Sequence, residues 1–332
     1  MGWNKSGWRF LAGWALAVTV CCGLAEVYLR WQPPEDQYPY LGEDSPLTGI
    51  YKPDEDFGVT YKDWNALKTE NTQKWTEYEL VLEGEEDLPV WAFFGNSFVH
   101  APGMLADQMR ASVKHHKIFN LGKNVPVLLR LAQMKLFLEH GLEPERMFLS
   151  FLPVDSLVIG AFPLETVHVT MKGALTYRPT IPTGPVGCLI ARSRLGFTAW
   201  VRTGGHVGNW QYSRKRRHGK IDPVFLADLR TLFGNLSKIA GNHDVPVTVI
   251  LIPEHNQIVR GRGFGFQDDV GKILREVGID AFDPRQVFLE HPNPRSLYLP
   301  DKHLSLEGNQ LLMRELLAHL NGFSSKPLAK KQ

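Results

Sequence analysis

The sequence predicts an α/β fold built on a doubly wound parallel sheet, together with a transmembrane helix at the N-terminus. From residue 89 onward, short apolar runs alternate with stretches of helical periodicity. This is the pattern of a parallel sheet covered by helices on both faces. An almost wholly apolar stretch near the N-terminus is long enough to cross a bilayer. The 332 residues, 43% of them apolar, suffice for one soluble domain of above-average size plus an accessory segment.

The apolar N-terminal stretch covers residues 8–31. A helix of that length spans about 36 Å. Lys5 and Arg9 precede its core and aromatic residues gather at both ends, which favours a cytoplasmic N-terminus with the following domain outside the cytoplasm. We therefore predict a cytoplasmic segment at residues 1–7 and an uncleaved, single-pass anchor at 8–31 in the inner (cytoplasmic) membrane, with a periplasmic or extracytoplasmic soluble domain.

Two alternatives to an anchor are open. A cleaved signal peptide fits less well, because no small-x-small cleavage pattern follows the apolar core. A buried core helix fits less well, because the aromatic ends and the Pro33-Pro34 stop suit a membrane helix better.

Charge and cysteine content limit the possible partners. The formal net charge of +2 gives no general reason to expect nucleic acid or acidic substrates. Cys21 and Cys22 lie in the apolar stretch, which leaves Cys188 alone in the rest of the chain, so no disulfide can form within the soluble part.

Residues 32–88 mix Pro, acidic and aromatic residues without sustained periodicity. We predict a membrane-proximal segment there, with a few short strands, one of them at 76–82 where apolar and polar residues alternate.

The soluble domain is predicted at residues 89–322, followed by a flexible tail at 323–332. Its strands are expected at 91–94, 118–121, 147–152 and 247–252. Helical patterns occupy 104–115, 127–140, 223–240, 266–277 and 307–320. Asp280 and Asp283 lie at the end of a further short strand, where we expect structural roles.

The stretch from 156 to 222 is far longer than a usual connection, so we treat it as an insertion. It contains the basic run Arg214-Lys215-Arg216-Arg217. This run is either an ordinary solvated loop or a site that attracts anionic lipid headgroups, an anionic glycan or a partner membrane protein.

Candidate catalytic residues lie far apart in the chain. Ser97 follows an apolar run that stops at Gly95-Asn96, and Asp301 and His303 stand two residues apart before the last helix. A serine hydroxyl needs an adjacent base that is itself oriented by a third group, and these three residues could supply those roles. Strand ends at the carboxyl edge of such a sheet are where active sites assemble, and Ser97 follows one of them.

Each residue also has a structural interpretation. Ser97 alone would most often be a turn or helix-capping serine, and His303 could be a surface histidine before a helix capped by Ser305. Metal binding is disfavoured, because the adjacent His115 and His116 point about 100° apart on a helix. The remaining histidines lack ligand spacing, so we expect no metal and no cofactor.

The order Ser97, Asp301, His303 and the strand-to-turn setting of the serine resemble the SGNH (GDSL-type) hydrolase and acyltransferase superfamily. That family's first motif reads Gly-Asp-Ser, here Gly95-Asn96-Ser97, and its last reads Asp-x-x-His or Asp-x-His. Its second block, a glycine after the second strand, is matched by Gly122. The resemblance covers residues from about 89 to 322 and implies a flavodoxin-like three-layer sandwich.

The resemblance also implies roles for these residues. Ser97 would form an acyl-enzyme, His303 would transfer its proton and Asp301 would hold the imidazole tautomer. The backbone amides of Ser97 and Gly122 would bind the oxyanion, with Asn96 or Asn124 as further side-chain donors. The chain departs from the family's third block, Gly-x-Asn-Asp, where Val154 stands in place of the oxyanion-hole asparagine. Losing one such donor costs about a hundredfold to a thousandfold in turnover, which damages catalysis without abolishing it.

On this basis we expect a serine esterase or O-acyltransferase that acts on an acyl group, in the first place acetyl, of an envelope glycan, a lipid-linked glycan or an exopolysaccharide. The resemblance extends to the acyltransferases that work beside membrane-bound O-acyltransferases, so such a protein is an expected partner and nucleic acid is not. The alternative is a catalytically silent SGNH-like fold that serves as a membrane assembly or binding subunit, and Val154 favours it.

Overall fold

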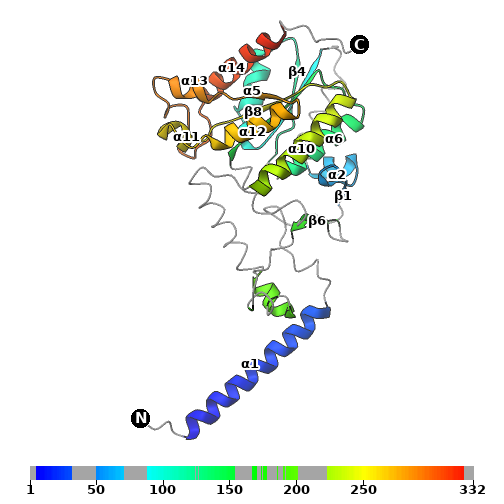
Figure 1. Cartoon of the computed structure of the whole chain (residues 1–332), viewed down its shortest axis with the longest axis vertical. Coiled ribbons are helices and arrows are strands. Elements are labelled where there is room, and N and C mark those ends of the chain that lie inside the picture. The colour runs from blue at the N-terminus through cyan, green and yellow to red at the C-terminus, as the bar shows by residue number, and fades with distance from the viewer. Residues whose placement is uncertain are drawn as a thin grey trace.

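The computed structural model describes residues 5–31, 50–70, 88–153 except 124 and 126, short pieces between 167 and 200, and 223–324. Five parallel strands form the main sheet in the order β4-β3-β5-β8-β9. In chain order this is 2-1-3-4-5, the flavodoxin-like doubly wound arrangement. The predicted α/β fold with a parallel sheet flanked by helices is confirmed (Figure 1).

The strands of the main sheet are β3 (Val90–Phe94), β4 (Lys117–Asn120), β5 (Arg146–Phe151), β8 (Val247–Leu251) and β9 (Asp280–Phe282). Every residue of β8 is buried, as are the last five of β5. Central strands of a parallel sheet are covered on both faces, and they therefore read as continuous apolar runs. For that reason the four predicted strands agree with the structure to within one residue at each end.

Helices cover both faces of this sheet. One core cluster joins the sheet to α6 (Val127–Glu139), α10 (Pro223–Asn242) and α12 (Gly265–Glu276). A second cluster, on the other face, draws on α5 (Leu105–Ser112), α11 (His255–Arg260), α13 (Arg285–Glu290) and α14 (Leu306–Ser324). The five predicted helices are present with ends that differ by at most four residues.

A hairpin of β1 (Tyr51–Asp54) and β2 (Gly58–Tyr61) packs into the first of these cores, and α2 (Trp64–Glu70) follows it. Phe57 and Tyr61 are fully buried. The ammonium of Lys135 on α6 lies 2.7 Å from Asp54 and 2.6 Å from Asp56, and the side chain is only 12% exposed. Part of the segment 32–88 therefore belongs structurally to the domain.

Within the insertion, β6 (Val167–Val169) and β7 (Leu175–Tyr177) form a second two-stranded sheet, which the sequence analysis did not predict. Leu175 packs with Val59 of β2 and with Leu128 and Leu129 of α6. The strand expected at 76–82 and the basic run 214–217 lie outside the described residues.

At the N-terminus, α1 (Lys5–Trp31) contains an apolar stretch, Phe10–Trp31, with a mean hydropathy of 1.8. None of this stretch is buried inside the molecule, and the helix extends away from the sheet domain (Figure 1). The alternative of a buried core helix is therefore wrong. By length and composition α1 can cross a membrane, a test that a signal sequence also passes.

Candidate active site

Ser97 lies at the sharp turn that follows β3. A side chain at Gly95 would clash with the hydroxyl of Ser150 on the neighbouring strand, so the turn requires glycine there. Asn96 is extended, and its side-chain oxygen accepts a hydrogen bond of 3.1 Å from the amide of Phe98. Asn96 thus caps the short helix α4 (Ser97–His100), and Ser97 is the first helical residue.

A second loop brings Asp301 and His303 to Ser97. Tyr298 and Leu304 form an antiparallel bridge, and the amide of Leu299 donates a 2.8 Å hydrogen bond to the carbonyl of His303. We call residues 298–304 the 298–304 hairpin. Lys302 takes a positive φ of 74° at its tip, a conformation that side chains seldom adopt.

The three predicted residues form one hydrogen-bonded chain. Nε2 of His303 lies 2.7 Å from Oγ of Ser97, although the two residues are 206 positions apart. Nδ1 of His303 lies 3.1 Å from Oδ2 of Asp301. The other oxygen of Asp301 accepts a hydrogen bond of 3.1 Å from the backbone amide of His303. The carboxylate therefore fixes the imidazole through both the ring and the main chain.

The charge of Asp301 determines which ring nitrogen of a neutral His303 carries the proton. The hydrogen bond from the His303 amide, above all, holds the pKa of Asp301 below its usual range, so the group is ionised at neutral pH. An ionised carboxylate only accepts hydrogen bonds, so Nδ1 must carry the imidazole proton. Nε2 is then left to accept a hydrogen bond from the hydroxyl of Ser97.

No family model matches the chain, and no curated protein matches its sequence. Solved structures are similar to it, among them the following three. A lipase/acylhydrolase from Enterococcus faecalis has 13% sequence identity and a TM-score of 0.39, over 74% of this chain and 100% of that one. An α/β hydrolase enzyme from the metagenome of Lake Arreo, Spain, also has 13% identity and a TM-score of 0.39, over 70% and 95%. A protein from Lactobacillus plantarum has 12% identity and a TM-score of 0.37, over 72% and 99%.

Two buried residues that the sequence analysis did not single out hold the 298–304 hairpin. The hydroxyl of Tyr298 donates a 2.9 Å hydrogen bond to the carbonyl of Pro253, which follows β8. The side-chain amide of Asn309, fully buried on α14, donates to the carbonyls of Leu304 and Ser305 at 3.2 and 3.0 Å. Both residues lie within ten positions of His303, but sequence spacing alone does not reveal their partners.

The start of α14 also shapes this region. Ser305 accepts a 3.1 Å hydrogen bond from the amide of Gly308, so it caps the helix as the structural interpretation of this stretch expected. A side chain at Gly308 would clash with the carbonyl of Leu297. Glycine thus lets α14 pack closely against the loop that leads into the 298–304 hairpin.

The expected oxyanion donors are described only in part. The amide of Gly122 donates to the side-chain oxygen of Asn120 at 3.3 Å, a long hydrogen bond. The side-chain oxygen of Asn96 is engaged by Phe98, as described above. Asn124 and Val154 lie outside the described residues.

Asp280 and Asp283 make hydrogen bonds with residues other than Ser97, Asp280 with Thr248 and Asp283 with the amide of Arg285. Asp280 begins β9 and therefore lies at the amino edge of the parallel sheet, whereas Ser97 follows the carboxyl end of β3. Its carboxylate accepts hydrogen bonds from His319 of α14 at 3.0 Å and from Thr248 of β8 at 2.8 Å. Within the described residues, no group of three or more histidine, cysteine or acidic side chains could hold a metal ion.

Proposed function

We propose that this protein is a membrane-anchored serine hydrolase or O-acyltransferase in which Ser97 is the nucleophile. The observation that carries the proposal is the hydrogen-bonded chain from Ser97 through His303 to Asp301, at 2.7 and 3.1 Å. A hydroxyl, an imidazole and a carboxylate in this order are what nucleophilic acyl transfer requires.

The reaction would proceed in two halves. Oγ of Ser97 attacks the carbonyl carbon of an ester while Nε2 of His303 takes the hydroxyl proton. The tetrahedral intermediate collapses as His303 gives that proton to the departing alcohol oxygen, which leaves the acyl group on Ser97. Asp301 stabilises the imidazolium that exists between these transfers.

The second half decides between the two activities. Water or an acceptor hydroxyl attacks the acyl-enzyme carbonyl, His303 takes its proton, and the proton returns to Oγ of Ser97 as the new acid or ester leaves. Water as the acceptor makes the protein an esterase, and a sugar hydroxyl makes it an O-acyltransferase.

The proposed substrate is an acetyl group on an envelope glycan, a lipid-linked glycan or an exopolysaccharide. The resemblance to the SGNH superfamily supports this substrate, and α1 supports action at a membrane. We further propose that α1 stays in the inner membrane with the sheet domain on its periplasmic or extracytoplasmic side, near a membrane-bound O-acyltransferase.

A covalent probe tests the nucleophile. The full chain in mild detergent is treated with a fluorophosphonate and weighed intact, beside Ser97→Ala as the matched variant. We expect the parent to gain one probe mass and the variant to gain none. Equal labelling of both proteins, or no labelling of the parent, would contradict an activated Ser97.

The second candidate function is a silent, SGNH-like membrane assembly or binding subunit. The observation that favours it is the hydrogen bond between the Gly122 amide and Asn120, because that amide is a proposed oxyanion donor. Asn120→Ala separates the two functions. If the protein is an enzyme, release of the Gly122 amide should maintain or speed labelling of Ser97, whereas a silent subunit should stay unlabelled in both forms.

The proposed location is tested by extraction and by a reporter. An uncleaved anchor predicts that the protein needs detergent for release and keeps its full mass. It also predicts that a reporter enzyme that works only after export is active when it is fused after Gln332. Release by high salt, or a mass shortened by the apolar stretch, would contradict it.

A further inference from the structure

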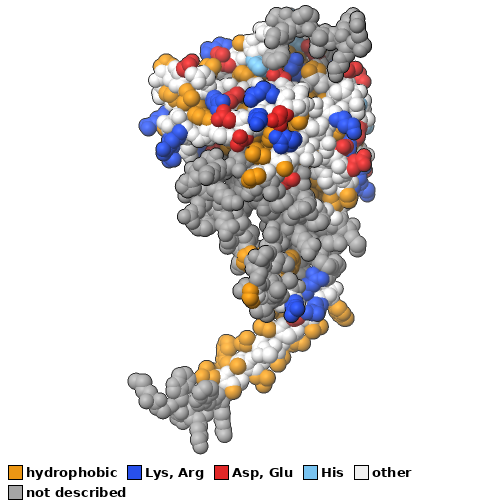
Figure 2. All heavy atoms as spheres, in the orientation of Figure 1, with side chains coloured by type: hydrophobic (Ala, Val, Ile, Leu, Met, Phe, Trp, Pro, Cys, Tyr) orange, Lys and Arg blue, Asp and Glu red, His pale blue; other side chains and the backbone are white. Residues whose placement is uncertain are grey.

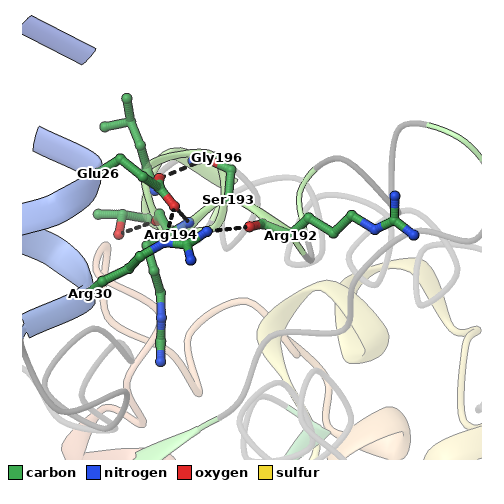
Figure 3. Close-up of polar contacts among 8 residues, drawn as sticks. Glu26, Arg30, Arg192, Ser193, Arg194 and Gly196 are labelled. Carbon is green, nitrogen blue, oxygen red and sulfur yellow. Dashed lines mark hydrogen bonds and ion pairs between the residues drawn. The ribbon is translucent and has the colours of Figure 1, made fainter. Parts of the chain in front are cut away.

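The domain-side end of α1 makes a specific contact with the insertion. Glu26 points from α1 to the start of a helical segment at residues 194–200 (Figure 3). Its carboxylate accepts hydrogen bonds from the amides of Arg194 and Leu195, at 2.9 and 2.8 Å, and from the hydroxyl of Ser193 at 2.9 Å. Ser193 in turn accepts from the amide of Gly196 at 2.9 Å. Glu26 therefore completes the N-terminal cap of a helix 168 residues away.

This contact is built from groups that need one another. A carboxylate within an apolar span is costly unless it is paired and hydrogen-bonded. Here three donors from the insertion and Arg30, whose Nε lies 2.9 Å from the carboxylate, meet that need. The insertion is thereby fixed beside the last turns of α1.

The same contact gathers positive charge. Arg30 also donates to the carbonyl of Arg192 at 3.1 Å, so this contact brings Arg30, Arg192 and Arg194 to the end of α1, with the side chain of Arg192 extending away from Glu26 (Figure 3). Arg30 is 61% exposed and Arg192 is exposed as well. Basic side chains accordingly gather where the apolar helix meets the rest of the molecule (Figure 2).

Aromatic side chains mark the same level of α1. Tyr28 and Trp31 are 61% and 91% exposed. Exposed tyrosine and tryptophan at the end of an apolar span lie at the level of the lipid headgroups. With α1 in a membrane, the arginines would lie at the depth of the phospholipid phosphates, and a guanidinium can bind a phosphate with two parallel hydrogen bonds.

We infer that Arg30, Arg192 and Arg194 form a basic cluster that binds the headgroup phosphates of anionic phospholipids. The inference rests on the proposed membrane anchoring. The arginines are opposite in charge to a lipid phosphate, and they lie at the end of the proposed membrane span. Glu26 organises the cluster, because its bonds to Ser193, Arg194 and Leu195 hold the backbone of this segment beside the last turns of α1.

Lipid retention tests the inference. The full chain is reconstituted in vesicles of equimolar phosphatidylcholine and phosphatidylglycerol, purified in mild detergent, and its retained lipids are quantified. Since each juxtamembrane basic residue favours an anionic lipid by about fivefold, we expect at least about fivefold enrichment of phosphatidylglycerol in the parent. The triple variant R30Q/R192Q/R194Q should retain the two lipids at their bulk ratio.

A matched triple variant controls for charge. Arg260, Arg262 and Arg314 are exposed arginines of the sheet domain. Their change to glutamine should leave the enrichment intact. Enrichment that persists in R30Q/R192Q/R194Q, or that is absent from the parent, would overturn the site. If the parent were released from vesicles without detergent, the anchoring itself would fail, which is a separate outcome.

Hydrogen exchange tests the organising role of Glu26. In Glu26→Gln the amides of Arg194 and Leu195 lose a charged acceptor, so their exchange should accelerate by about tenfold while the amides of α14 stay unchanged. Phosphatidylglycerol enrichment should fall in the same variant. Unchanged exchange at both amides would refute the cap, and unchanged enrichment would refute its role in lipid binding.

Discussion

Asp301→Asn should lower the reactivity of Ser97 toward a fluorophosphonate more than Asp301→Ala does. In Asp301→Asn, the His303 amide would keep its 3.1 Å hydrogen bond to the remaining side-chain oxygen. The new amide group would then face Nδ1 of His303 and donate to it. That contact favours the tautomer with its proton on Nε2, which cannot accept the proton of Ser97.

Exposure sets the size of the effect. Where the orienting aspartate is buried, its change to asparagine costs about ten-thousandfold in turnover. The side chain of Asp301 is 65% exposed, so water competes for the new amide and screens the lost charge. We expect the rate of fluorophosphonate labelling to fall by about tenfold to a hundredfold in Asp301→Asn. The labelling rate should fall less in Asp301→Ala, because the imidazole of His303 without its partner samples both tautomers.

Labelling rates are measured over time by intact mass, with Ser97→Ala as the blank and circular dichroism as the folding control. The order parent, alanine, asparagine from fastest to slowest is the expected result. An asparagine variant that labels as fast as the parent would show that Asp301 does not set the tautomer. If Asp301→Ala were labelled more slowly than Asp301→Asn, the hydrogen bond from the His303 amide to residue 301 would matter for the reactivity of Ser97, and the tautomer of His303 would not.

Three further predictions concern stability. Tyr298→Phe leaves the buried carbonyl of Pro253 without its donor, so it should lower the free energy of unfolding, measured in urea, by about 1–3 kcal/mol. The labelling of Ser97 should also slow, and an unchanged free energy of unfolding would contradict this prediction. Gly308→Ala should lower the free energy of unfolding by about 1–3 kcal/mol, because the new methyl group clashes with the carbonyl of Leu297. Gly322→Ala, in open space on the same helix, should raise it by about 0.5–1 kcal/mol. Burial opposes the ionisation of Asp280, but hydrogen bonds from His319 and Thr248 outweigh it and hold its pKa below the usual range. The ionised Asp280 carboxylate therefore stabilises the folded state above the ordinary aspartate pKa, and this contribution is lost as pH falls through the lower pKa of the folded state. The difference in free energy of unfolding between the parent and Asp280→Asn should accordingly become smaller in acid.

Features that depend on local pattern were predictable from the sequence. The central strands read as continuous apolar runs because both faces of β5 and β8 are buried. Capping by Asn96 and Ser305 follows from residue type and position. The pairing of Ser97 with His303 was predicted from chain order and from the resemblance to a known superfamily.

Features that depend on distant pairs were not predictable. Lys135 reads as one lysine in a helical pattern, and only the fold places it between two carboxylates 81 and 79 residues earlier. Glu26 reads as an interruption of an apolar stretch, although its partners lie in the insertion. Neither contact leaves a periodic signal, because each depends on where the chain returns in space.

The hairpin β1–β2 has a consequence for the order of folding during synthesis. It leaves the ribosome early, yet Asp56 contacts Lys135 and its carbonyl accepts a 2.6 Å hydrogen bond from Asn235, 179 residues later. The hairpin cannot complete its packing until α6 and α10 have been made. Contacts of such long sequence separation fold slowly, because the intervening loop must close first. The first strands of the domain to be synthesised therefore dock among the last, and until then Phe57 and Tyr61 stay open to aggregation or to a chaperone.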